Sequence, residues 1–177
     1  MRYQLACASF VVLISLGMPA ARACAFLVPP SPIATETTQA YAGRVEEYLN
    51  VAERKREANA VRTADTILIA RITRLETSDG QAPSNTLGLE PVDWLKGERP
   101  PGAFSLTSRM TECGPSGAGD AARGQVGGLF VIFARKGPLG SGTLIDAIAV
   151  DHVIDPGLAK FVTTYRAAPT IGKPSGN

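Results

Sequence analysis

The stretch Leu129-Phe130-Val131-Ile132-Phe133-Ala134 decides the fold class of this chain of 177 residues. It is the most apolar run after residue 23, and its β-branched and aromatic side chains favour a strand. An unbroken apolar run of this kind is typical of a strand that is buried on both faces. Residues 135–140, which include Gly137-Pro138, end the run in a turn. We therefore expect residues 129–134 to form a central strand of a β-sheet.

Four other segments have the composition of strands. Residues 66–75 begin as a buried run and end in alternating apolar and polar side chains. Residues 86–95 form a second strand, in which Pro91 requires an edge position or a bulge because proline has no N–H to donate. Residues 103–108 and 143–150 complete the set. Five short strands, preceded by a helix and joined by loops of mixed length, predict a small barrel.

A long helix is predicted before the strands. Apolar side chains recur at helical spacing over residues 36–60, and Thr35 or Thr37 can serve as the N-cap. The apolar positions are Tyr41, Val45, Tyr48, Leu49 and Ala52. We interpret the charged runs Glu46-Glu47 and Arg54-Lys55-Arg56 as solvent-exposed parts of this helix.

A second, shorter helix is predicted after the strands. Asp155 can cap it and Pro156 can occupy its first position, where a missing N–H has no consequence. Its apolar face consists of Leu158, Phe161, Val162 and Tyr165. Residues 167–177 are rich in Pro, Gly and Ser and are expected to form a disordered tail.

The first 23 residues have the features of a secretory signal peptide. Arg2 supplies a positive start, residues 5–17 are apolar, and Ala21-Arg22-Ala23 has the small-x-small form of a cleavage site. The apolar run is shorter than the roughly 20 residues that span a bilayer. We expect cleavage near Ala23 and a periplasmic or secreted protein without a transmembrane segment. The alternative is a lipoprotein leader, after which an acylated Cys24 would anchor the chain to a membrane.

The leader also accounts for the positive net charge. Arg2 and Arg22 belong to the 18 basic residues, whereas none of the 16 acidic residues precedes Cys24. A chain cleaved after Ala23 is formally neutral, so its charge provides no reason to expect nucleic acid as a partner.

Two of the three cysteines, Cys24 and Cys113, lie beyond the leader. Two cysteines in an exported chain most simply form one disulfide, and the alternative is two free or intermolecular thiols. A bridge between them would close a loop of about 90 residues and stabilise the fold by on the order of 4 kcal/mol.

No catalytic constellation is evident. His152 is the only histidine, and with two cysteines expected in a bridge it leaves too few ligands for an intrinsic metal site. The glycine-rich residues 114–128 lack the lysine or hydroxyl of a phosphate loop, and we interpret them as a flexible connection. Trp94 is expected to pack in the core. We expect neither enzymatic activity nor a cofactor, unless other residues cluster around His152.

Several motifs follow one another in an order that can be compared with a known family. Cys24 directly follows the leader and precedes Val28-Pro29-Pro30. Ala64-Asp65 leads into the first strand, and the second strand contains Val92-Asp93-Trp94-Leu95-Lys96-Gly97. Thr111-Glu112-Cys113-Gly114 follows the third strand and precedes the apolar run at 129–134. In this order the chain resembles the netrin-like domain of tissue inhibitors of metalloproteinases and its short bacterial relatives.

The resemblance implies a fold and a domain layout. It implies a mainly β domain over residues 24–166, built as a five-stranded OB-fold-like barrel with a long N-terminal and a short C-terminal helix. It also implies a bridge between Cys24 and Cys113. The second bridge of the family is absent as a pair, because Phe26 replaces one cysteine and residues 143–150 contain no other.

The resemblance further implies how such a domain would act. In the inhibitors of this family, the N-terminal amine and the carbonyl of the first cysteine chelate the zinc of the target enzyme. Cys24 would do so here, and Ala25 would point into the specificity pocket. The flanking ridge would consist of Phe26, Leu27, Val28, Pro29, Ser108, Arg109, Met110, Thr111 and Glu112. We therefore expect a monomeric, non-enzymatic module that binds a protein partner, with a zinc metalloproteinase as the alternative partner.

Overall fold

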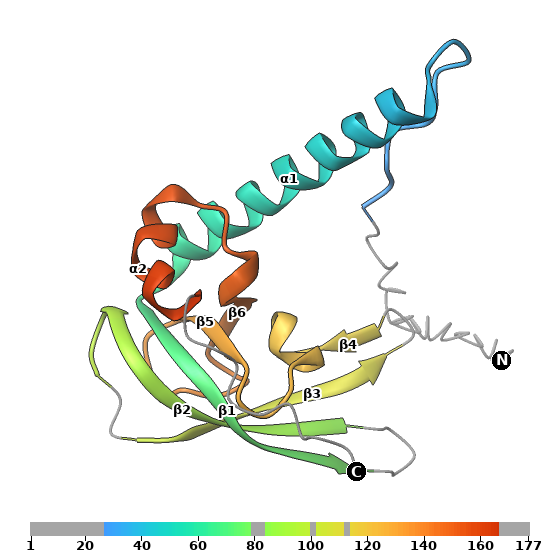
Figure 1. Cartoon of the computed structure of the whole chain (residues 1–177). Coiled ribbons are helices and arrows are strands. Elements are labelled where there is room, and N and C mark those ends of the chain that lie inside the picture. Colours follow the sequence, from blue (N-terminus) through green and yellow to red (C-terminus); the bar gives the residue numbers. More distant parts are fainter. Residues whose placement is uncertain (1–26, 79–83, 100–101, 112–113, 167–177) are drawn as a thin grey trace, which may run out of the picture.

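The computed structural model describes residues 27–78, 84–99, 102–111 and 114–166, and its main feature is one antiparallel sheet. Two α-helices accompany the sheet in this part of the chain (Figure 1). The strands are β1 (Thr66–Ser78), β2 (Ser84–Lys96), β3 (Phe104–Thr111), β4 (Gly114–Ser116), β5 (Leu129–Ala134) and β6 (Leu144–Ala149). Their order in the sheet is β4-β3-β2-β1-β5-β6. The expectation of a mainly β fold is confirmed.

The apolar run at residues 129–134 forms β5, an interior strand of the sheet. β5 pairs with β1 on one side and with β6 on the other, and all its residues after Leu129 are buried. The four other predicted strands are also present. β4 was not predicted, because its three residues lie in the glycine-rich segment that we interpreted as a flexible connection. That interpretation was wrong for residues 114–116.

Pro91 of β2 lies at a bulge and also at a position without a second strand neighbour among the described residues, so both predicted settings are found. The pairing of β1 with β2 passes from Ile69 and Asp93 to Ala70 and Pro91, so that Val92 is an extra residue in a bulge. β3 pairs with β2 only over residues 84–89, which leaves the other edge of β2 without a strand partner at Pro91. Pro91 therefore lies next to a bulge and pairs with β1 alone, and both settings tolerate a missing N–H.

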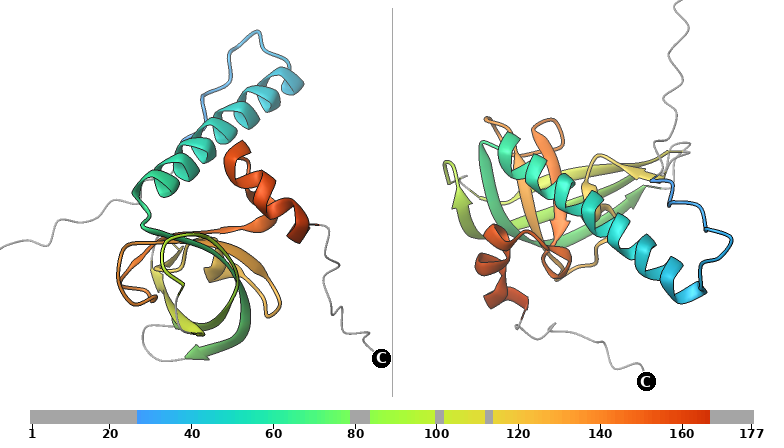
Figure 2. Two further views of the ribbon diagram at one scale, coloured as in Figure 1. Left: turned by 90° about the vertical axis from the view of Figure 1, so that its left-hand side faces the viewer. Right: turned by 90° about the horizontal axis from the view of Figure 1, so that it is seen from above.

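The sheet is strongly curved, and its concave face encloses one of two apolar cores (Figure 2). The buried members of this interior core are Leu68, Ala70, Ile72, Leu87, Leu89, Leu106, Ala118, Ala121, Ala122, Phe130, Ile132 and Ala147. Trp94 packs against the edge of this cluster and is partly buried, as expected for a core side chain. Its indole Nε1 is buried without a hydrogen-bond partner among the described residues.

A short 3₁₀-helix, η1 (Gly119–Arg123), fills the gap between the two edges of the sheet. β4 and β6 are the edge strands, and in the described residues they do not pair with each other. η1 contacts both of them and contributes Ala121 and Ala122 to the interior core. On the β6 side, Asp120 Oδ2 accepts the N–H of Ala149 at 3.4 Å. η1 thereby covers a strand edge that would otherwise be open to association.

The second core lies between the outer face of the sheet and the two helices. α1 (Thr38–Thr63) contributes Ala60 at its C-terminal end, and α2 (Pro156–Arg166) contributes Leu158 and Val162. α1 begins and ends two to three residues later than predicted, with Thr37 as its cap through a 3.2 Å bond from Ala40 N–H. Asp155 caps α2 through a 3.0 Å bond from Leu158 N–H, as predicted.

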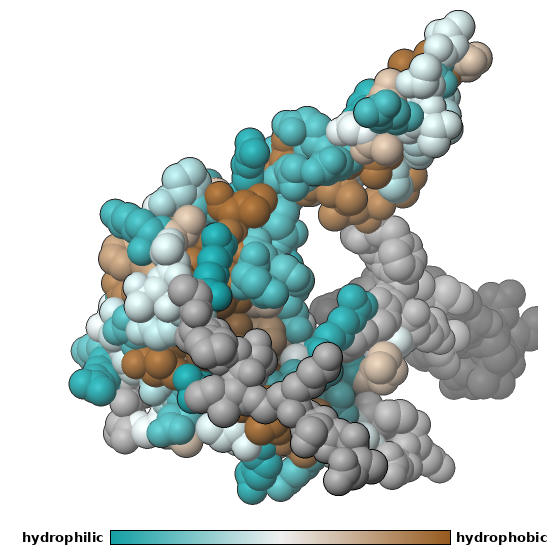
Figure 3. Space-filling view, in the orientation of Figure 1, coloured by the Kyte–Doolittle hydropathy of each residue, from teal (hydrophilic) through white to brown (hydrophobic). Residues whose placement is uncertain are grey.

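Only the C-terminal end of α1 packs on the sheet, and the rest of the helix projects from the molecule (Figure 1). Tyr48 and Leu49, two members of its predicted apolar face, are exposed. In Figure 3 apolar side chains gather on the underside of the projecting half. The helical spacing predicted the helix correctly, although most of its apolar face is not part of either core.

Three expectations fall on residues outside the described ranges. They are the signal peptide at 1–23, the bridge between Cys24 and Cys113, and the disordered tail at 167–177. None of the helices in the described part of the chain is both long and apolar enough to cross a bilayer.

Candidate functional site

Part of the predicted binding ridge lies in two exposed segments. Leu27 and Val28, in the arm before α1, are 57% and 74% exposed, and Met110 in β3 is 55% exposed. Arg109 and Thr111 are exposed as well. Ser108 is only 3% exposed, so its side chain is not available to a partner. Pro29 in the arm is also exposed. The other predicted positions, which are Cys24, Ala25, Phe26 and Glu112, lie outside the described residues.

Ion pairing fixes the arm to the start of α1. Arg44 binds both carboxylate oxygens of Glu36, through Nε at 2.9 Å and Nη2 at 2.6 Å, and the same Nη2 donates to Ser31 O at 3.0 Å. The N–H of Ile33 donates to Glu36 at 3.2 Å. The hydrogen bonds from Arg44 lower the pKa of Glu36. From this anchor the arm runs back toward the end of the sheet at which β3 turns into β4 (Figures 1 and 2).

A second candidate site was not predicted from the sequence. It is a cleft of about 910 Å³ between α1, η1, α2 and the ends of β5 and β6. The charged residues that line it are Glu53, Arg56, Arg71, Asp120, Arg123, Asp151, His152 and Arg166. Leu129, Phe130 and Val150 contribute apolar surface. A concave surface with a few convergent polar groups is the usual form of a small-molecule site.

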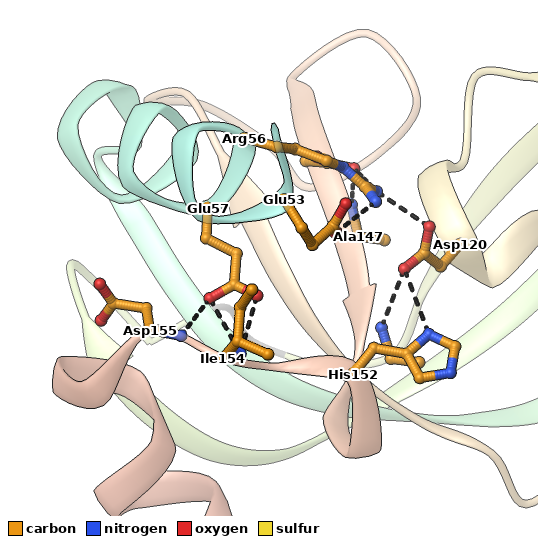
Figure 4. A network of polar contacts seen from close by, with 10 residues as sticks. Glu53, Arg56, Glu57, Asp120, Ala147, His152, Ile154 and Asp155 are labelled. Atoms are coloured by element: carbon orange, nitrogen blue, oxygen red, sulfur yellow. Dashed lines mark hydrogen bonds and ion pairs between the residues drawn. The ribbon is translucent and has the colours of Figure 1, made fainter. Parts of the chain in front are cut away.

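Arg56 organises one end of this cleft (Figure 4). Its guanidinium binds Asp146 through Nε at 2.7 Å and Nη2 at 2.8 Å. It also binds Asp120 at 2.9 Å and Glu53 at 2.9 Å. The hydrogen bonds to Asp146, together with those to Asp120, raise the pKa of Arg56 above its usual value. One side chain of α1 thus connects the helix to β6 and η1. The expectation that Arg56 is part of a solvated face was wrong, although Arg54 and Lys55 are exposed.

His152 lies at the edge of the Arg56 cluster. It ends the short 3₁₀-helix η2 (Val150–His152), which follows β6 as expected for a residue at a strand end. Its Nδ1 is 4.0 Å from Oδ2 of Asp120, and its side chain is 67% exposed. The described residues that line the cleft include no serine, threonine, cysteine or lysine that could act as a nucleophile. No group of metal-ligating side chains is found in the described ranges.

Glu57 holds the two helices together from a buried position. Its side chain is fully buried, and its oxygens accept the N–H groups of Ile154 at 2.9 Å and Asp155 at 2.6 Å. These N–H groups lie just before α2, as Figure 4 shows. Burial raises the pKa of Glu57, because a buried carboxylate has lost its hydration, and the two backbone bonds offset only part of this effect.

We expect this group to make stability decrease as the pH rises. Because the folded-state pKa of Glu57 lies above the ordinary value of 4.5, the unfolded chain releases this proton at lower pH than the folded chain does. The contribution of Glu57 is therefore fully present below pH 4.5 and is lost as the pH rises through the folded-state pKa. The Glu57→Gln variant lacks this loss, so its free energy of unfolding should improve relative to the parent as the pH rises above 4.5.

Urea denaturation of both proteins across this range measures the difference. The exposed Glu47 of the same helix provides a control, and Glu47→Gln should leave the stability profile of the parent unchanged. A parent protein that gains stability relative to Glu57→Gln as the pH rises would contradict the expected sign.

Comparisons with known proteins add no assignment to this geometry. No family model matches the chain, and neither a curated protein nor a solved structure matches it.

Proposed function

We propose that this chain is a non-enzymatic binding module that contacts a protein partner through the arm and the exposed end of β3. The observation that carries this proposal is the exposure of the large apolar side chains Leu27 and Val28 in the arm and Met110 in β3. Single exposed apolar residues are common on protein surfaces. Here they coincide with the ridge that the resemblance to netrin-like domains implies.

The anchoring of the arm supports this proposal. From Leu27 onward the arm contains no strand or helix, but Arg44 and Glu36 tie its C-terminal part to α1 through several hydrogen bonds. Pro29, Pro30 and Pro32 restrict the backbone further. A segment that is already ordered loses less conformational entropy when it binds, and its affinity is correspondingly higher.

We further propose that the curved sheet is a variant of the OB-type barrel. In this variant η1 replaces direct hydrogen bonding between the two edge strands. The contacts of η1 with both β4 and β6 support this proposal, as does the core that these elements enclose.

The proposed compartment is the periplasm or the extracellular space, reached after cleavage near Ala23. Intact mass of the exported protein, with and without reductant, tests this together with the cysteine pairing. We expect a chain that begins at Cys24 and gains two hydrogens on reduction. A mass increased by acyl chains would instead support the lipid anchor.

A second candidate function is inhibition of a zinc metalloproteinase through the N-terminal amine and carbonyl of Cys24. The exposure of Leu27 and Val28 favours it, because α1 does not cover these two side chains. The α-amino group has a pKa near 8, so an unprotonated amine is accessible for zinc at neutral pH.

Titration of the cleaved protein against a panel of zinc metalloproteinases tests this second function. We expect stoichiometric inhibition of at least one enzyme, and we expect the inhibition to disappear when one alanine is added before Cys24. The added residue displaces the amine from the metal but leaves the rest of the ridge unchanged. Equal inhibition by the extended chain would exclude chelation by Cys24.

The broader binding function is tested by crosslinking in intact cells. We expect Val28→Asp to abolish a specific crosslinked species, because a carboxylate on the ridge must be desolvated when a partner binds. Val126→Asp is the matched control, since Val126 is also largely exposed, at 61% against 74% for Val28, but lies in the loop between η1 and β5. If both variants retain or both lose the species, the ridge is not the binding surface.

A further inference from the structure

The cleft described above carries two sets of charged side chains. In the first, Arg56 is surrounded by three carboxylates, those of Glu53, Asp120 and Asp146. The second consists of Arg71, Arg123 and Arg166, and we call the part of the cleft that they line the arginine end. Asp151 and His152 also line the cleft, and Asp151 has no cationic partner among the described residues. The arginine end therefore presents three guanidinium groups against one carboxylate that is not engaged elsewhere.

The backbone brings Arg71 and Arg123 to the same part of the cleft. Gly127 N–H donates to Ile72 O at 2.7 Å, and Ile72 N–H donates to Gly128 O at 2.9 Å. These two bonds attach the loop after η1 to β1 directly beside Arg71, and Arg123 lies at the start of this loop. Within the described residues, neither arginine forms a hydrogen bond or an ion pair through its side chain. Their positions have no evident role in holding the fold together.

Arg166 is fixed in place by neutral groups. Its Nε donates to Val150 O at 3.0 Å, and its Nη2 donates to Val153 O. Carbonyl oxygens hold the guanidinium without cancelling its charge, unlike the carboxylates around Arg56. The arginine end thus includes one cation whose orientation is set before any ligand arrives, which lowers the entropy lost on binding.

The cleft also has apolar surface. Leu129 of β5 and Tyr165 of α2 line it and are partly buried, whereas Phe130 and Val150 are almost fully buried and offer little surface. A ligand with an apolar body would cover Leu129 and the ring of Tyr165 while its charged group contacts the arginines. This combination of an apolar surface with a few oriented polar groups is typical of small-molecule sites.

We propose that the arginine end of the cleft binds a small molecule with a single oxyanion group, a carboxylate or a phosphate, attached to an apolar body. Guanidinium groups bind both oxyanions through paired, charge-assisted hydrogen bonds. The excess of carboxylates around Arg56 disfavours a second anionic group further along the cleft. Polyanions such as nucleic acid or sulfated polysaccharides therefore do not match the cleft.

The test uses the exported protein and two probes, phenyl phosphate and benzoate, which distinguish the two oxyanions. Chemical shifts of the Gly124, Gly127 and Gly128 amides report binding beside Arg71 and Arg123. We expect saturable shifts with at least one probe, and an affinity at least about tenfold weaker in the Arg71→Gln/Arg123→Gln double variant. Arg54→Gln removes an exposed arginine of α1 outside the cleft and should leave the affinity unchanged.

The double variant is expected to remain folded, because both side chains are exposed and without partners in the described structure. An unchanged melting temperature verifies this independently of binding. The proposal is overturned if these amides do not shift, if the double variant binds as tightly as the parent, or if phenol binds as tightly as the anionic probes. Tighter binding of a heparin fragment than of either probe would overturn the restriction to a single anionic group.

Discussion

Replacing Arg56 with alanine should lower the free energy of unfolding by about 2–3 kcal/mol. The substitution removes the cation that Asp146, Asp120 and Glu53 share, and it leaves three carboxylates close together at the junction of α1, β6 and η1. Removing one partner of a buried ion pair costs about 3–5 kcal/mol. The Arg56 side chain is 32% exposed, so water compensates part of this loss and the lower range applies.

Two variants make the result specific to the ion pairs. Arg54→Ala, two residues away on the exposed side of the same helix, should change stability by less than about 0.5 kcal/mol. Arg56→Lys retains the charge but cannot bind Asp146 through two nitrogens, so it should restore only part of the loss. Equal stabilities of Arg54→Ala and Arg56→Ala in urea denaturation would show that the cluster contributes little.

The second large effect is expected at Gly119, where η1 meets β6. A Cβ at this position would lie 2.6 Å from both N and O of Ala147, and these are backbone atoms that cannot rotate away. The backbone of Gly119 has a φ of +53°, a conformation that disfavours other residues. Steric overlap and backbone strain together should lower the free energy of unfolding of Gly119→Ala by about 2–4 kcal/mol relative to the parent.

Gly43 provides the opposite case within the same chain. It lies inside α1 in the projecting half, and a Cβ there would meet nothing within 4 Å. Gly43→Ala should therefore stabilise the protein by up to about 1 kcal/mol through helix propensity alone. Thermal unfolding of both variants provides the comparison. A Gly119→Ala variant as stable as the parent would show that η1 can move away from β6 without loss.

The two α-helices and the strong strands could be predicted because their signals are local, although both ends of α1 lie two to three residues later than predicted. The apolar run of β5 and the alternation in β1 reflect which faces are buried, and each pattern is contained within its own strand. Thr37 and Asp155 cap helices three residues away or less, so their side-chain chemistry is enough to mark the helix starts. Pro91 likewise predicted an edge position or a bulge, because a proline cannot donate a ladder hydrogen bond in any strand.

β4 and η1 could not be predicted because glycine has two uses that look alike in a sequence. We interpreted the glycines after Cys113 as a sign of flexibility. Gly117 and Gly119 instead have positive φ and approach other backbone closely, at Thr107 and Ala147. Which of the two uses applies depends on strands that are distant along the chain.

The Arg56 cluster was missed for a similar reason. Asp120 and Asp146 lie 64 and 90 residues from Arg56, and no spacing rule connects residues so far apart. Within its own helix, Arg56 belongs to a basic run that is typical of a solvated face. The burial of Glu57 could not be predicted either, because its partners are the backbone N–H groups of residues 154 and 155, far along the chain.

The sequence by itself therefore determined the two α-helices, the five main strands and the mainly β class, because burial periodicity, caps and proline act over a few neighbouring residues. Only the tertiary structure decided which charges meet, where the cleft opens and that half of α1 projects unused by either core. These features depend on contacts between distant segments. Such contacts form only when the curved sheet brings its two edges to η1 and sets the helices against its outer face.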